Sequence, residues 1–335
     1  IMTMQAIQPP GVANDRAIAV KYILLITFLL IYPWVASPFW IVQIGAQTLV
    51  LGIIALSLTF LAGYGGMVSF AQLSVAGCAG YMTAILGFNS ANLGMGWHWG
   101  PAILAAIAIA VIFGTIIGIL SVRTEGIYTI MITLAISVGF FYFVRQNYPI
   151  FNGWTGFSGL APPVIAGLNL RDPIPFYYLC LVFAALAYFA VVYMGRSTFG
   201  LALQGIRDND RRMRALGFNV IAHRIFAYSI AALIASLGGI LMVWLNGRIS
   251  SGTVGVGPTI DILIISVVGG LGHPIGAFIG SILFTLLENF AVDLVARERF
   301  NMLIGAVFLI IVLFSPDGIL GLWQKVKEGL QKRTI

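Results

Sequence analysis

The charged residues whose types and spacing could do chemistry gather in one polar stretch, residues 196–224. Asp208 and Asp210 stand where a short helix would begin, and arginines follow them, so charges of both signs would complement the dipole of that helix. Gly217 stands where a helix-ending glycine is expected. The arginines of this stretch are at positions 196, 207, 211, 212, 214 and 224.

The residues before this cluster predict a first short helix with one apolar face, formed by Phe199, Leu201, Leu203 and Ile206. Two short helices joined by a turn could sit in a groove on a soluble partner. A basic loop lying on anionic lipid headgroups would explain the same arginines. The residues alone leave both interpretations open.

A second group of candidates lies in the stretch 63–80, GYGGMVSFAQLSVAGCAG. The side chains of Ser69, Gln72 and Ser74 could form hydrogen bonds with a polar solute, and Gly65 and Gly66 would leave room beside it. Small and polar residues also serve the packing of helices against each other. The stretch therefore predicts either a translocation path or a helix contact.

The chain shows no pattern typical of catalysis or metal binding. The histidines at 98, 223 and 273 are scattered, with no carboxylate or cysteine cluster beside them. Cys78 and Cys180 are far apart in apolar segments. A phosphate-binding Walker A pattern is missing, so we do not expect this chain to hydrolyse ATP. We expect a protein that is not an enzyme and that binds no metal and no cofactor itself.

The elements that must position these residues are membrane helices. The chain has 335 residues, of which 60% are hydrophobic and 9% charged. A soluble domain carries about 25% charged residues, so this composition indicates an integral membrane protein. Apolar runs of roughly 17–25 residues predict an all-α fold, a polytopic membrane helical bundle. The net charge of +7 lies in short loops, so we expect contact with a lipid bilayer and no binding of nucleic acid.

The hydropathy pattern predicts about ten transmembrane spans, at 21–40, 41–62, 66–88, 100–121, 127–145, 175–194, 224–246, 259–273, 275–294 and 300–315. A cytoplasmic N-terminal tail (1–20) would precede the transmembrane domain (21–315), and a cytoplasmic C-terminal tail (316–335) would follow it. With both termini inside, the basic residues left outside are Arg145, Arg171, Arg248, Arg297 and Arg299. The other 13 of the 18 basic residues are then cytoplasmic, as the positive-inside rule requires.

Two of these spans have unusual sequences. The stretch 63–80 is rich in glycine, serine and glutamine, and the short span 259–273 ends in GGLGHP. Both are candidates for broken or re-entrant helices, which are tolerated where protein surrounds them. The GxxxG spacings Gly114/Gly118 and Gly272/Gly276/Gly280 predict close helix packing.

The acidic residues Asp261, Glu288 and Asp293 fall near predicted span ends, where their carboxylates could reach water. A carrier driven by an ion gradient often has a charged residue at mid-membrane. The lack of one here favours a pore that is driven from outside the membrane.

Six segments resemble, in order, the permease subunits of ABC importers for branched-chain amino acids, specifically the LivM type. The first three are GYGGMVSFAQLSVAGCAGYMTAIL (63–86), RTEGIYTIMITLAI (123–136) and TGFSGL (155–160). The other three are FGLALQGIRDNDRRMRALGFNV (199–220), VVGGLGHPIGAFIG (267–280) and FSPDGILGL (314–322). The resemblance covers about residues 41 to 322.

This resemblance implies that the loop 196–224 couples the chain to a cytoplasmic ATPase. It assigns that role to Ile206, Arg207, Asp208, Ala215, Leu216 and Gly217. Arg212, Met213 and Arg214 stand where the family often has Ala-Ala-Glu, which leaves open which ATPase is recognised.

The resemblance also implies partners. We expect a second homologous permease, two ATPases that bind ATP and Mg, and a periplasmic solute-binding protein, all at a bacterial inner membrane. The expected cargo is a branched-chain or related amino acid, with urea, amides and aromatic acids as alternatives. The acidic Gly-Asp-Leu-Ser signature of ribose-type permeases is missing, which disfavours a sugar. The rival hypotheses are a secondary transporter or channel that works without ATP, and a membrane scaffold.

Overall fold

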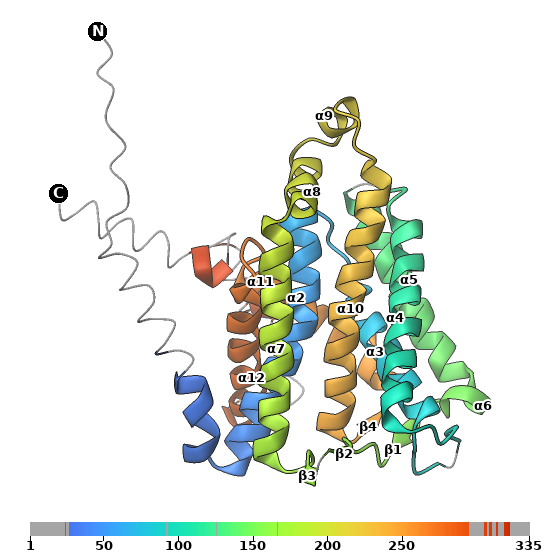
Figure 1. The fold of residues 1–335 in the computed structure, drawn as a ribbon, viewed down its shortest axis with the longest axis vertical. Helices are drawn as coiled ribbons and strands as arrows, with labels where there is room; N and C mark the ends of the chain where they lie inside the picture. The colour runs from blue at the N-terminus through green and yellow to red at the C-terminus, as the bar shows by residue number, and fades with distance from the viewer. Residues whose placement is uncertain are drawn as a thin grey trace, which may run out of the picture.

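The structure, a computed structural model, describes residues 24, 27–91, 93–124, 126–165, 167–294, 305–306, 308–309, 313 and 318–321. In this part of the chain, most helices form an upright bundle, and one short loop with two helices projects from it (Figure 1). We call the end that carries this loop the α9 end and the opposite end the β4 end.

The bundle consists of helices of two lengths. The longer ones are α2 (Gln47–Gly65), α4 (Trp99–Ser121), α5 (Ile127–Gln146), α7 (Pro173–Arg196), α10 (Val220–Asn246) and α12 (Ile275–Leu294). The shorter ones are η1 (Trp40–Ala46), α3 (Gln72–Leu86), α6 (Tyr148–Phe151), η2 (Ser251–Val254) and α11 (Val256–Gly269). The projecting loop holds α8 (Thr198–Asp208) and α9 (Asp210–Ala215).

Two small strand pairs close the β4 end. Strand β1 (Phe157–Ser158) pairs antiparallel with β4 (Arg248–Ile249), so that Phe157 lies opposite Ile249. Strand β2 (Val164–Ile165) pairs antiparallel with β3 (Leu168–Asn169). The β1–β4 pair ties the connection between α5 and α7 to the end of α10.

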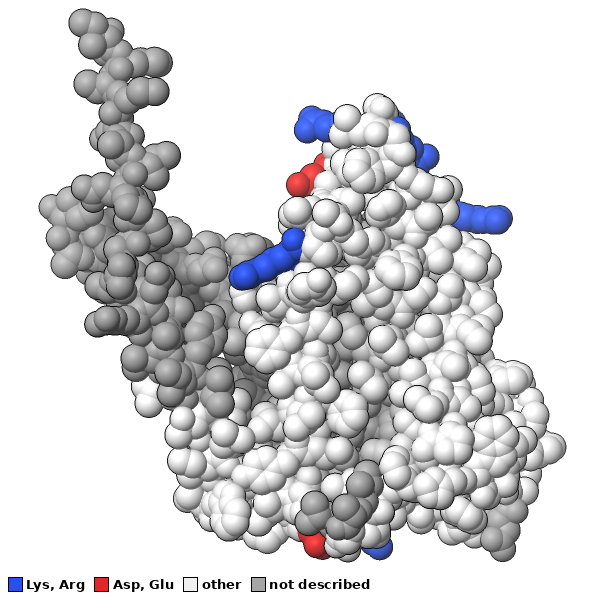
Figure 2. Space-filling view, in the orientation of Figure 1, with Lys and Arg blue, Asp and Glu red and all other residues white. Residues whose placement is uncertain are grey.

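Five helical segments of the described chain are long and apolar enough to cross a membrane, with lengths from 20 to 27 residues. They are Trp40–Gly65, Trp99–Ser121, Ile127–Gln146, Pro173–Arg196 and Val220–Asn246. At 1.5 Å per residue, each reaches about the 30 Å of a hydrocarbon core. Figure 2 shows the charged atoms of this face at the two ends of the bundle, with an uncharged band between them. The expectation of a helical membrane bundle is therefore confirmed.

The predicted count of ten spans is not confirmed. Eight of the predicted spans coincide with α2, α3, α4, α5, α7, α10, α11 and α12. The described part of the span expected at 21–40 is helical at 27–35, and the span expected at 300–315 lies mostly outside the described residues. The tail 1–20 and most of the tail 316–335 lie outside them as well. The placement of both termini inside stays a prediction.

Helix α10 forms the centre of the bundle and packs against α2, α3 and α4. Helix α3 is enclosed almost completely, and Tyr81 in it has no exposed surface. In contrast, α4, α5 and α7 each present large apolar side chains outward, as a lipid-facing surface requires. The enclosed position of α3 explains how a helix with glutamine, serine and glycine is stable in an apolar bundle.

The stretches 63–80 and 259–273 each hold a short helix, and their being broken or re-entrant spans stays a prediction. Helix α3 has 15 residues and starts after the non-helical segment 66–71, and α11 has 14 residues and starts after the segment 250–255. Val254 packs against Gly77 in α3. Each helix is about 22 Å long, shorter than a hydrocarbon core.

Glycines bring helix backbones into direct contact. Gly114 and Gly118 of α4 face Ala232 and Tyr228 of α10, so the packing predicted for that GxxxG spacing is confirmed. Gly276 and Gly280 of α12 lie against the backbone of α11 near Gly269. The inclusion of Gly272 in this series was wrong, because no atom lies within 4 Å of the position its β-carbon would take. The residue belongs to the turn between the helices and is exposed.

Candidate functional site

The projecting loop has its helix starts fixed by side-chain caps. Ser197 caps α8 by accepting a 3.2 Å hydrogen bond from the backbone nitrogen of Gly200. The Asn209 side chain caps α9 by accepting a 2.9 Å hydrogen bond from the backbone nitrogen of Arg212. The Asn219 side chain caps α10 by accepting a 3.1 Å bond from the backbone nitrogen of Ala222. Each cap is worth about 1 kcal/mol, so the two short helices form a defined element, which we call the α8–α9 element.

The end of α9 matches its prediction, and its start lies two residues after Asp208, at Asp210. Gly217 has a φ of +89°, and the nitrogen of Phe218 reaches back to the carbonyl of Met213, so Gly217 ends the helix as expected. Asp208 was expected at the start of the second helix, but it is the last residue of α8. Asn209 takes the capping position instead, because its side chain accepts the backbone hydrogen bond there.

A small apolar core holds the α8–α9 element together. It consists of Ala202, Ile206, Met213 and Val220, contributed by α8, α9 and the start of α10. Leu203 is also fully buried, but it faces the main core. The prediction that Leu201 shares the apolar face was wrong, since its side chain is 60% exposed. A helical turn is 3.6 residues, so Leu201 points away from the side that Ala202 and Ile206 share.

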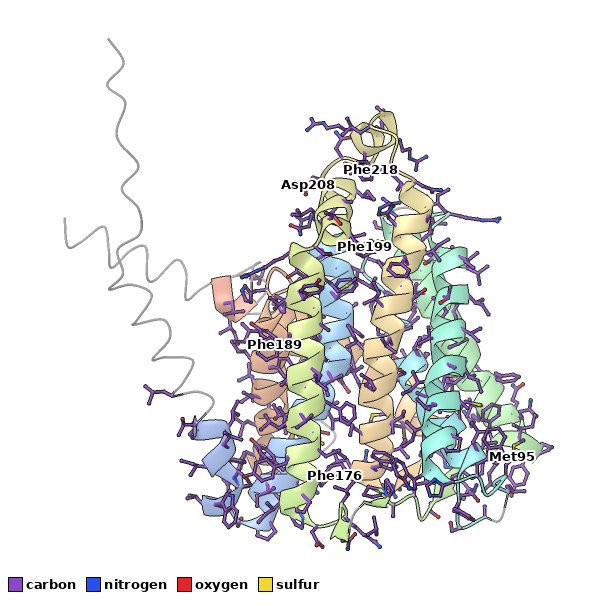
Figure 3. All side chains as sticks on the ribbon, in the orientation of Figure 1. Met95, Phe176, Phe189, Phe199, Asp208 and Phe218 are labelled. Carbon is purple, nitrogen blue, oxygen red and sulfur yellow. The ribbon has the colours of Figure 1, made fainter. Side chains whose placement is uncertain are left out.

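Aromatic rings fasten the element to α10. The His223 ring of α10 stacks on Phe199 of α8, with a centroid distance of 5.7 Å and an interplanar angle of 8°. Phe218 meets the same imidazole edge-on at 5.8 Å. His223 thus packs between the two ends of the loop. Figure 3 labels Phe199, Asp208 and Phe218 in this region.

Charges cover the outer side of the element. Asp210 pairs with Arg214 at 2.6 Å and with Arg224 at 3.6 Å, whereas Arg211 and Arg212 are exposed. The Leu216 side chain next to them is 67% exposed. An exposed apolar residue among arginines is typical of a docking surface, because it combines an apolar anchor with charges that steer the partner.

The residues assigned to ATPase coupling divide into two groups. Ala215, Leu216 and Gly217 are exposed at the tip, where a partner could contact them. Ile206 is buried in the core of the element, and Arg207 is directed toward the bundle, with Asp208 beside it at 3.0 Å. Their role in coupling stays a prediction. The structure adds that Ile206 and Arg207 face this chain's own helices, whereas the Asp208 side chain is 67% exposed.

The end of α2 receives the α8–α9 element. Arg207 donates a hydrogen bond to the carbonyl of Gly63, and its side chain lies over Gly66, where φ is +65°. Leu203 of α8 lies beside Gly65. A side chain at Gly66 would both strain the backbone and displace Arg207. The glycines of this segment therefore allow α8 to contact the α2 backbone directly.

A chain of hydrogen bonds starts where α2 ends. The nitrogen of Phe70 donates to Thr133 of α5 at 3.1 Å, and Ser57 of α2 donates to the Gln72 side chain at 3.1 Å. Ser69 accepts from the nitrogen of Ala71 at 3.3 Å. These contacts fix the non-helical segment 66–71 and the first turn of α3.

The same network joins the two short helices α3 and α11. The hydroxyl of Ser74 in α3 lies 2.8 Å from that of Ser137 in α5, which in turn lies 3.4 Å from the hydroxyl of Thr259 in α11. All three side chains are buried. Hydroxyl groups enclosed in this way are paired with each other rather than with solvent.

The candidate path residues therefore occupy two places. Gly65 and Gly66 contact the α8–α9 element, whereas Ser69, Gln72 and Ser74 lie in the buried network with exposed fractions of 1%, 3% and 0%. Their role in translocation stays a prediction. Gln72 pairs with Ser57 of α2 and Ser74 with Ser137 of α5, so in this conformation a solute could reach Ser74 only after α3 and α5 separate.

Cysteine labelling measures that separation. In a background without Cys78 and Cys180, we expect Ser74→Cys to react slowly with a water-soluble thiol reagent. Its rate should be at most about one tenth of the rate of the exposed control, Thr198→Cys. The reason is that the reagent reaches position 74 only when the helices open. Labelling at position 74 that increases during the transport cycle would support a path there. Protection at position 74 in every state of the cycle would exclude it.

Two carboxylates lie deeper than the sequence suggested. Glu288 was expected at a span end, but it lies within α12, where it accepts a 3.0 Å hydrogen bond from the Gln47 side chain of α2. Asp261 lies in α11 close enough to interact with Glu288, and both are partly buried. The side chain of Asp293 lies outside the described residues. Among the described residues no cluster of three or more metal-binding side chains occurs.

Comparison with known proteins gives a family match. A family model described as "Branched-chain amino acid transport system / permease component" matches residues 40–312. The LivM permease of the high-affinity branched-chain amino acid system of Salmonella typhimurium is 23% identical, over 89% of this chain and 76% of LivM.

Permeases for other solutes match to a similar degree. The ribose import permease RbsC of Haemophilus influenzae is 24% identical, over 92% of this chain and 94% of RbsC. The autoinducer 2 permease LsrC of Yersinia pestis is 26% identical, over 69% of this chain and 66% of LsrC. The expectation against a sugar thus gains no support from these relatives. No solved structure matches the chain.

Proposed function

The chain belongs to the family of branched-chain amino acid transport system permease components, and from this premise we propose that it is the membrane subunit of an ATP-driven importer. Its cargo would be a branched-chain or related amino acid. The chain would form the solute pathway together with a second, homologous permease in a bacterial inner membrane. It would catalyse no reaction itself.

The observation that carries this proposal is the α8–α9 element. It is a capped, self-packed pair of helices that projects beyond the bundle and exposes Leu216 among arginines. We place the α9 end in the cytoplasm, where two ATPases with ATP and Mg would dock on it. The N- and C-termini would lie on the same side. A periplasmic binding protein would deliver the solute at the β4 end.

A continuous set of contacts links the α8–α9 element to the candidate pathway. A partner that moves the element would move Leu203 and Arg207, which contact the end of α2. The segment 66–71 follows directly and leads to the hydrogen bonds of Gln72 and Ser74. Because packed contacts switch between discrete arrangements, a small shift at α8 could separate α3 from α5.

Purification in mild detergent tests the assembly. We expect the tagged chain to bring a second permease and two ATPases from its native membrane, identified by mass spectrometry. The cognate binding protein then gives the cargo: its affinity for leucine, ribose, urea and aromatic acids can be compared directly. A chain that stays folded but brings no ATPase would contradict the proposal.

The Glu288 site supports a second candidate, a carrier driven by an ion gradient. Carboxylates inside membrane bundles often mark ion or proton sites. Uptake into vesicles that lack ATP distinguishes the two functions. Uptake that needs ATP and survives collapse of the ion gradients supports the importer, whereas gradient-driven uptake without ATP supports the carrier.

A further inference from the structure

A pocket of about 490 Å³ lies on the flank of the bundle at the α9 end. It is formed where α2, α7, α8 and the turn between α11 and α12 meet. Its lining includes Tyr64, Arg196, Leu201, Gln204 and His273. The volume is in the range of sites that bind small molecules. The pocket is separate from the exposed tip of the α8–α9 element and from the buried serine network.

The lining of this pocket is suited to an anion. Arg196 lines it and, among the described residues, forms no ion pair, and no carboxylate belongs to the lining. Tyr64 lines the pocket as well, close enough to Arg196 to interact with it, and its hydroxyl is a hydrogen-bond donor. The Nδ1 atom of His273 accepts from the nitrogen of Ile275, which leaves the hydrogen of the neutral ring on Nε2 as a donor. A phosphate group is the anion that a guanidinium with neighbouring donors recognises best.

The surface below the pocket is suited to acyl chains. Val182, Leu186, Phe189 and Tyr193 of α7 are 55%, 58%, 66% and 76% exposed. Their spacing of three and four residues places them in one stripe along the helix, and Arg196 follows three residues after Tyr193. Phe189 of this stripe is labelled in Figure 3. Lipid-facing apolar side chains thus lead up to a cationic pocket at the end of a membrane helix.

We propose that this pocket binds the phosphate group of an anionic phospholipid, with the acyl chains lying along the outer stripe of α7. The phosphate would pair with Arg196 and accept hydrogen bonds from Tyr64 and His273. Arginine in the last turn of a membrane helix lies at headgroup depth, where this phosphate is present in high local amount. The lipid is a ligand in addition to any transported solute.

The site also connects the lipid to the α8–α9 element. Leu201 and Gln204 of α8 line the pocket, and Gln204 donates hydrogen bonds to the carbonyls of Gly195 and Gly200. A bound headgroup would bridge α7, α8 and the end of α2. If the proposed ATPase docking is correct, the lipid would steady the element that receives the ATPase.

Native mass spectrometry tests the binding without relying on transport. The protein, with the subunits it retains, is placed in nanodiscs of phosphatidylethanolamine with a minority of phosphatidylglycerol. The protein is then released from the nanodisc in the mass spectrometer, and the phosphatidylglycerol molecules that stay bound to it are counted. We expect Arg196→Ala to lower the retained amount about tenfold, as the loss of a charged hydrogen bond predicts. Tyr64→Phe, which removes only a hydroxyl, should lower it by a smaller factor.

Arg248→Ala is the matched control, because it removes an exposed arginine at the other end of the bundle. It should retain phosphatidylglycerol like the unchanged protein. Equal retention by Arg196→Ala, Tyr64→Phe and Arg248→Ala would overturn the proposal. If millimolar inorganic phosphate displaces the lipid, the ligand of the pocket is a soluble phosphate and the phospholipid proposal is wrong. If the protein binds no ATPase but still loses the lipid when Arg196 is replaced, the lipid site holds and the proposed importer function fails.

Discussion

Replacing Gly269 with valine should leave almost no folded protein. Gly269 ends α11 at the point where α12 crosses it, and a β-carbon there would overlap the carbonyl of Gly276 and lie 3.0 Å from the nitrogen of Gly280. Backbone atoms cannot turn aside as a side chain does, so the two helices would have to separate. Overpacking of this kind costs about 3 kcal/mol or more, a large part of the stability of a typical protein. The yield of monodisperse protein in mild detergent measures the loss.

Gly272→Val is the matched control for this substitution. Gly272 lies three residues further on, in the turn after α11, is exposed, and has no atom within 4 Å of its β-carbon position. The same change of side chain should therefore leave the yield near that of the unchanged protein. If Gly269→Val were recovered at the same yield as Gly272→Val, α11 and α12 would not be packed through their backbones.

Replacing Gly217 with tryptophan should lower ATP-driven uptake about tenfold or more, while the bundle stays folded. Gly217 is exposed at the tip of the α8–α9 element, and its surroundings are open. A tryptophan side chain would occupy the space that a docked ATPase needs, and a loss of about 1.4 kcal/mol in docking already gives a tenfold effect. Uptake and the amount of co-purified ATPase are the two measurements.

Backbone strain must be separated from bulk at this position. Because φ at Gly217 is +89°, any other residue adds strain, and asparagine adds among the least. Gly217→Asn should therefore keep most of the uptake. Uptake by Gly217→Trp at the level of Gly217→Asn, with equal assembly, would exclude docking through this tip.

The sequence predicted the parts of the fold that depend on local chemistry. Gly217 ends a helix because the chain there needs a left-handed backbone, and that need is visible in the residue type. The contact of Gly114 and Gly118 with α10 follows from small residues one turn apart. Hydropathy also located eight helices of the bundle, since each is predominantly apolar.

The errors arose at helix boundaries and where a partner distant in the chain decides the outcome. The same spacing that placed Gly276 and Gly280 in a contact failed for Gly272, because the helix begins only after it. The helix expected to start near Asp208 begins at Asp210, because Asn209 takes the capping position. The partner of Glu288 inside the bundle is Gln47, which lies 241 residues away in the chain.

The candidate site was only partly accessible to sequence reasoning. Gly65 and Gly66 were grouped with Ser69 because they are neighbours in the chain. In the structure α2 ends at Gly65. The two glycines contact α8, whereas Ser69 belongs to the buried network. The pocket beside Arg196 left no local signal. Its lining residues come from four elements, and only the fold brings them together.

The enclosed helix α3 has a consequence for how the protein is made. With 15 residues it is too short to cross a bilayer by itself, and α10, which covers it, ends 160 positions after α3 ends. At the usual ~5–20 residues per second, ribosomes would take roughly 10–30 s to deliver α10. We therefore expect α3 to wait for that time beside the insertion machinery, and a stop codon placed before α10 should yield a chain that is degraded rather than released into the bilayer.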